Sequence, residues 1–129
     1  MQDIDIASTD RSPAVRFDVA RGHLTIRGES YPEDAAKFFG PLLLCLRRFL
    51  QEAEVHALKL DLEMSYFNSS TAKALMNTFQ IAEEAAAAGK DIVINWYFHE
   101  DDDAMREFGE DFSEDLVKAR FNFCPIIAT

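Results

Sequence analysis

The chain has 129 residues, a length typical of one domain, and 48% of them are apolar, which is enough for a single core. Its formal charge of -10 argues against binding to nucleic acid or to an anionic membrane surface, because both repel Asp and Glu. The sequence shows neither a signal peptide nor an apolar run long enough to span a bilayer, so we expect a cytoplasmic protein without membrane insertion.

The N-terminal part of the chain predicts strands. Residues 1–12 are polar and largely unpatterned, so they are either a loose arm or an edge strand. Apolar and polar residues then alternate over residues 15–19 and again over residues 24–26, with Arg21-Gly22 between the two runs. This period of two, with a glycine at the turn, predicts an antiparallel hairpin.

A helix is expected next. Ser30-Tyr31-Pro32-Glu33 fits a helix start, with Ser30 and Glu33 spaced as a capping box and the proline in the first turn. Apolar residues then recur every three or four positions from Phe38 to Leu50, which is typical of a helix that packs on the core. Gly40-Pro41 interrupts this pattern and predicts a kink, or a break into a short and a long helix.

Strands and helices alternate in the rest of the chain. Apolar residues at every second position predict a strand over residues 58–64 with one polar face, and a second strand is expected over residues 92–98. Between them, helical spacing from Ala72 to Ala82 ends at Gly89, where a C′ glycine belongs.

After the second of these strands, an acidic run leads into a third amphipathic segment, which contains Met105, Phe108, Phe112 and Leu116. A last strand that Pro125 interrupts is expected over residues 121–127, at an edge of the sheet. The order of elements predicts one α/β domain over residues 1–129. We expect a mixed, mainly parallel sheet with an N-terminal antiparallel hairpin and helices mostly on one face.

Motifs for catalysis are weak. His99 and the acids at 100–103 carry metal-binding atoms, but consecutive residues at a helix start point in different directions and no spaced ligand pattern is present. Ser69 and Ser70 lack the flanking glycines of a nucleophile elbow, and the five glycines form no nucleotide-binding motif. We therefore expect no enzyme, no metal and no cofactor, with an acid-cluster metalloenzyme as a remote alternative.

The segment from Tyr66 to Met76 is the candidate control point. Here an alternating pattern ends, hydroxyl residues follow, and helical spacing begins, so Asn68, Ser69 and Ser70 fall at N-cap positions. They could simply cap the helix. Alternatively, a serine here could be phosphorylated, because a helix N-terminus tolerates the added negative charge.

Several segments in this order resemble a known family. They are Gly28-Glu29-Ser30-Tyr31-Pro32-Glu33, Tyr66-Phe67-Asn68-Ser69-Ser70 with the following Lys73-Ala74-Leu75-Met76, Trp96-Tyr97, and Glu107-Phe108-Gly109-Glu110-Asp111-Phe112. The order of elements is similar to the SpoIIAA-like STAS domain of anti-sigma-factor antagonists. More specifically, the chain resembles the SiaC family of bacterial regulatory phosphoproteins.

The SiaC resemblance implies a partner-switching protein in cyclic-di-GMP signalling and biofilm formation. The unphosphorylated form would bind and activate a diguanylate cyclase. Phosphorylation by a dedicated Ser/Thr protein kinase would release the cyclase, and dephosphorylation by a PP2C-type phosphatase would restore the binding form. The implied phosphorylation site is Ser69, with Ser70 in reserve. The partner-binding residues around this switch are expected to be Tyr66, Asn68, Ser70, Thr71 and Lys73.

Two other functions fit a STAS-like domain. One is a small-ligand-binding domain with a pocket under the strand that carries Trp96-Tyr97, although aromatic residues in a strand are more often core residues. The other is an anti-sigma-factor antagonist.

Overall fold

The computed structural model describes residues 2–127, which form a six-stranded sheet and three helices. The elements, in chain order, are β1 (Ile4–Ile6), β2 (Ala14–Asp18), β3 (His23–Ser30), α1 (Ala35–Gln51), β4 (Ala57–Phe67), α2 (Ser69–Ala87), β5 (Asp91–His99), α3 (Asp103–Ser113) and β6 (Arg120–Ile126). The predicted alternation of strands and helices is confirmed.

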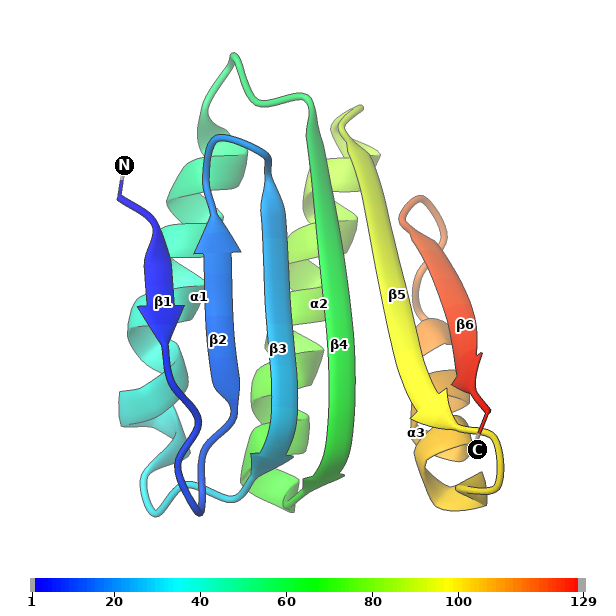
Figure 1. Cartoon of the computed structure of the whole chain (residues 1–129). Coiled ribbons are helices and arrows are strands. Elements are labelled where there is room, and N and C mark those ends of the chain that lie inside the picture. The colour runs from blue at the N-terminus through cyan, green and yellow to red at the C-terminus, as the bar shows by residue number, and fades with distance from the viewer. Residues whose placement is uncertain (1, 128–129) are drawn as a thin grey trace.

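The strands lie side by side in the order of the sequence, from β1 at one edge to β6 at the other (Figure 1). β1, β2 and β3 pair antiparallel, and β3 to β6 pair parallel, so the sheet is mixed and mainly parallel as predicted. Of the two alternatives for the first residues, Ile4–Ile6 form an edge strand. The predicted hairpin is also confirmed, and Gly22 takes a positive φ of 62° in its turn.

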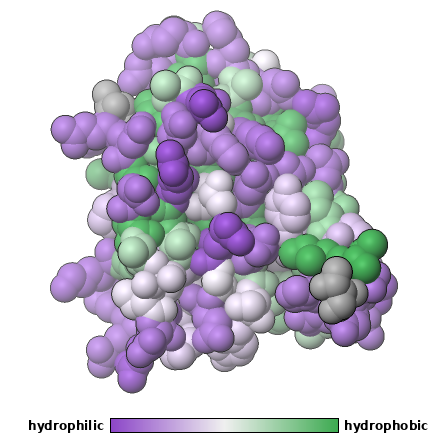
Figure 2. Space-filling model, in the orientation of Figure 1, coloured by the Kyte–Doolittle hydropathy of each residue, from purple (hydrophilic) through white to green (hydrophobic). Residues whose placement is uncertain are grey.

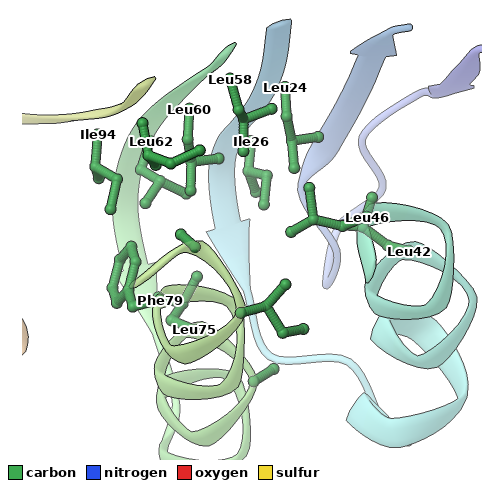
Figure 3. Close-up of a cluster of buried hydrophobic side chains, with 14 of the residues drawn as sticks. Leu24, Ile26, Leu42, Leu46, Leu58, Leu60, Leu62, Leu75, Phe79 and Ile94 are labelled. Carbon is green, nitrogen blue, oxygen red and sulfur yellow. The ribbon is translucent and has the colours of Figure 1, made fainter. Parts of the chain in front are cut away.

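All three helices lie behind the sheet in the view of Figure 1, which confirms that they cover one face. Each parallel strand pair needs such a crossover, and the apolar side of each helix packs on the inner face of the sheet. Figure 3 shows this core where side chains of the central strands, including Leu60 and Leu62, meet Leu42 and Leu46 of α1 and Leu75 of α2.

The other face of the sheet is mostly hydrophilic (Figure 2). Four polar residues from β3 to β6 lie in one register row across it, namely Thr25, Asp61, Asn95 and Asn122. The Asp61 carboxylate accepts from the Asn95 amide at 2.8 Å, and the Asn95 carbonyl accepts from the Asn122 amide at 3.0 Å. The polar positions predicted in the β4 strand therefore belong to a face without helices.

The expected start of the first helix is wrong, and so is one of the two alternatives for Gly40-Pro41, the break into two helices. Ser30 is the last residue of β3 and is fully buried, and the N-cap is Asp34, whose side chain accepts from the Lys37 N–H at 3.1 Å. α1 also continues through Pro41 without a break. The kink at this proline stays a prediction.

The C-terminal elements also differ in detail from the prediction. α3 ends at Ser113, so Leu116 packs on the core from the loop that follows and not from the helix. β6 runs through Pro125 to Ile126 rather than being interrupted there. Its place at the edge of the sheet allows this, because one side of an edge strand needs no ladder hydrogen bond.

Candidate functional site

The end of β4 is shaped by an irregularity in its pairing with β3. The register shifts between Gly28 and Glu29, so that Gly28 pairs with Met64 but Glu29 pairs with Tyr66. A bulge of this kind reverses which side chains face the core beyond it. As a result Tyr66 points outward and Phe67, the last residue of the strand, is buried.

Asn68 caps the helix that follows. Its side-chain oxygen accepts from the Thr71 N–H at 3.0 Å, and its own N–H donates to the Ser30 carbonyl at 3.1 Å. α2 then begins at Ser69. The N–H groups of Ser69 and Ser70 therefore lie at the positive end of the helix dipole without a partner in the helix, which favours an anion beside them.

The two candidate serines are both exposed but face different neighbours. Ser69 lies on the same side of α2 as Ala72 and Met76, at spacings of three and four. Ser70 instead lines a hollow between α1 and α2 together with Lys73. The structure therefore separates the two serines by the surface to which each belongs, which the sequence could not do.

Of the other predicted contact residues, Tyr66 and Lys73 are exposed and Asn68 is half-buried. The ring of Tyr66 packs edge-to-face on that of Tyr31 with their centroids 5.9 Å apart. Thr71 is fully buried, and its hydroxyl lies 2.8 Å from that of Ser30. The Thr71 side chain is therefore not on the surface of the isolated chain, and a role for this residue in partner binding stays a prediction. Its contact also identifies Ser30 as a supporting residue, which the capping-box pattern did not suggest.

The acidic run after β5 has a structural role. Asp102 is the N-cap of α3, its side chain accepts from the Met105 N–H at 3.0 Å, and Asp103 lies in the first turn. Between residues 2 and 127, no three or more His, Cys, Asp or Glu side chains are grouped so that they could hold a metal ion.

The alternative function, a small-ligand-binding domain, places a pocket under the strand that carries Trp96. The side chain of Trp96 is fully buried. Its ring lies against those of Phe112 and Phe121, with centroids 5.6 and 6.2 Å away, and its Nε1–H donates to the Met105 carbonyl at 2.9 Å. These contacts make Trp96 a core residue that holds α3 on the sheet.

Comparison with known proteins places this fold in the class of regulatory phosphoproteins. The family model described as SiaC family regulatory phosphoprotein matches residues 6–126. The chain belongs to the SiaC family. An uncharacterised protein of Pseudomonas aeruginosa strain UCBPP-PA14 is 34% identical to it over 115 residues, which are 89% of this chain and 90% of the relative.

Solved structures of SiaC proteins from Pseudomonas aeruginosa are also similar. Apo-SiaC matches with a TM-score of 0.87 at 33% identity, over 96% of this chain and 99% of the other. A chain in the crystal structure of the diguanylate cyclase SiaD in complex with its activator SiaC matches with a TM-score of 0.91 at 31% identity, over 96% of this chain and 100% of the other. In the described part of the present chain, no helix is long and apolar enough to cross a bilayer.

Proposed function

We propose that this chain is a cytoplasmic, non-catalytic partner-switching protein whose unphosphorylated form binds and activates a diguanylate cyclase. A Ser/Thr protein kinase would phosphorylate Ser69 and release the cyclase, and a PP2C-type phosphatase would restore binding. The observation that carries this proposal is the match to a SiaC structure in which SiaC is the activator of the cyclase SiaD. The match to the family model for regulatory phosphoproteins supports the phosphorylation step.

The geometry of the turn supports Ser69 as the modified residue. Ser69 is the first residue of α2, is exposed, and is followed by the free N–H of Ser70, while Thr71 is buried. A phosphate would add about -1.5 to -2 charges and three acceptor oxygens at the positive end of the helix, where the fold can tolerate them. Phosphorylation would thus change the surface without unfolding the domain. Ser70 is the reserve site.

Binding to the cyclase encoded in the same genome tests the switch. Ser69→Asp should abolish binding, and Ser69→Ala should bind as the wild type does. Ser70→Asp is the comparison variant, because it places the same charge at the reserve site, one residue away and on a different surface. Equal binding by Ser69→Asp and Ser69→Ala would rule out Ser69, and loss of binding in Ser70→Asp alone would move the switch to Ser70.

Mass spectrometry of the protein from its native cells tests the modification itself. We expect a phosphopeptide with the group on Ser69, which increases when the phosphatase is deleted and is lost when the kinase is deleted. A complete absence of phosphate from Ser69 and Ser70 across growth conditions would contradict the proposal.

A further inference from the structure

The surface between α2 and α3 contains an apolar groove with a volume of about 720 Å³. Its floor and walls are formed by six apolar side chains, which are Ala72, Met76, Phe79, Phe108, Phe112 and Leu116. Met76 is 49% exposed and Phe108 is 40% exposed, although both belong to apolar patterns typical of core residues. Apolar side chains that gather in such a groove favour contact with another apolar surface.

The groove is apolar at one end and acidic at the other. β4 and β5 are parallel, so α2 and α3 also run in the same direction behind them. At the starting end, the ring of Phe108 lies 4.8 Å from that of Phe67, immediately before Asn68 and Ser69. At the far end, the groove is lined by Glu83 and Glu84 of α2, and by Asp111 and Asp115 from α3 and its following loop. Among the described lining residues, four are acidic and none is basic.

We infer that this groove receives an amphipathic helix of the cyclase, with its apolar side on Met76 and Phe108 and its basic end beside Glu84 and Asp115. The inference rests on the proposed function and adds the docking surface to it. The wall formed by α2 from Ala72 to Glu83 is about 16 Å long, which corresponds to three turns of a bound helix. A helix in a groove anchors itself through apolar residues three and four apart, and the acidic end selects Lys or Arg at one end of that helix.

This docking mode explains how a phosphate on Ser69 could oppose binding despite a basic partner. Ser69 lies in line with Ala72 and Met76, at the apolar end of the groove and at the opposite end from Glu83 and Glu84. A bound helix that covers this end would remove water from the phosphate, and its own basic end would lie at the far end of the groove. Lys73 of this chain, one turn from Ser69 on α2, and the helix N-terminus would offset only part of this cost. Removing a phosphate dianion from water is unfavourable when the partner supplies no basic group, so the phosphorylated groove would reject the helix.

The test measures binding of the purified cyclase to variants of the full chain. Met76→Glu places a charge in the groove and should weaken binding at least about tenfold, whereas Met76→Leu should retain it. Leu44→Glu is the matched control, because Leu44 is 51% exposed on α1, away from the groove. It should bind as the wild type does.

The acidic end is tested by charge reversal and salt. Glu84→Lys with Asp115→Lys should weaken binding about tenfold or more and flatten its dependence on salt concentration. The control is Asp5→Lys with Asp10→Lys, which changes the net charge equally at exposed positions near the N-terminus. This variant should keep the affinity of the wild type and its dependence on salt concentration.

The outcomes separate the two proposals. If the wild type does not bind the cyclase, both the proposed function and the docking surface are overturned. If the wild type binds but Met76→Glu and Leu44→Glu bind equally well, only the groove is overturned. If Met76→Glu changes self-association of the chain and leaves cyclase binding intact, the occupant is a second copy of the chain and our inference is wrong.

Discussion

The hydroxyl oxygens of Ser30 and Thr71 lie 2.8 Å apart, and both side chains are fully buried. Thr71 Oγ1 also donates to the Ser30 carbonyl at 3.1 Å, so the Ser30 hydroxyl must be the donor to Thr71. This pair ties the first turn of α2 to the end of β3. It thereby determines that Thr71 faces the core while Ser69 and Ser70 face solvent.

Replacement of Thr71 by valine tests this contact. Valine has nearly the same shape but no hydroxyl, so Thr71→Val leaves the buried Ser30 hydroxyl without an acceptor. We expect the free energy of unfolding to fall by about 1–3 kcal/mol in urea titrations. The exposed neighbour serves as control, since Ser70→Ala should change it by less than about 0.5 kcal/mol. Equal stability of Thr71→Val and the wild type would show that the pair contributes nothing.

The N-cap is tested by Asn68→Ala and Ser69→Ala. The side chain of Asn68 accepts from the N–H of Thr71, so its loss should lower the free energy of unfolding by about 1 kcal/mol. Asn68→Asp keeps an acceptor oxygen at the same position and should retain most of that stability. Ser69→Ala should cost less than Asn68→Ala, as measured by urea unfolding. The opposite order would assign the cap to Ser69.

Close packing of α3 on Trp96 is tested by Gly109→Ala. A Cβ on Gly109 would lie 2.6 Å from Cδ1 of Trp96, so the helix or the indole ring must move. Overpacking of this kind costs about 1–3 kcal/mol, which exceeds the gain of about 1 kcal/mol from replacing a helical glycine by alanine. We expect lower stability and a shift in the fluorescence of the single tryptophan.

The control for this variant is Glu107→Ala, which also introduces an alanine into α3 but at an exposed position away from Trp96. Its stability and its emission should match those of the wild type. Gly109→Ala with unchanged stability and emission would show that the helix is not held against Trp96 as the structure indicates.

The carboxyl group of Glu83 should make the stability of the fold depend on pH. Burial acts to raise the pKa of its carboxyl group, but hydrogen bonds from the N–H groups of Ala119, Lys118 and Val117 outweigh this and hold the pKa below its ordinary value of 4.5. The folded state is therefore favoured when Glu83 is ionised. Its contribution is complete above pH 4.5 and is lost as the pH falls through the lower, folded-state pKa.

Urea unfolding well above and well below pH 4.5 measures this contribution. Glu83→Gln should lose less stability on acidification than the wild type does, because it has no carboxylate to protonate. Glu84→Gln changes the adjacent, exposed carboxylate and should follow the wild type. The same pH dependence in all three proteins would contradict the role of Glu83.

Much of the fold could be predicted because it follows from hydrophobic periodicity. The alternation over residues 58–64 and the helical spacing after Asn68 predicted the central crossover, and helices on only one face followed from the polar side of that strand. The candidate site was predicted for a similar reason. Asn68, Ser69 and Ser70 lie where the strand period of two ends and the helical spacing of three and four begins. A helix break was harder to predict, since α1 continues through Pro41 while its apolar side packs on the core.

The sequence by itself determined the elements, their order and the turn that presents hydroxyl groups, because these depend on residues close together in the chain. Tertiary structure alone decided which hydroxyls are accessible. Ser30 fits a local capping box, yet pairing with β4 beyond the bulge buries it against Thr71. Tertiary structure also left Met76 and Phe108 exposed in a groove between α2 and α3, because exposure depends on which elements become neighbours and not on the period of the sequence.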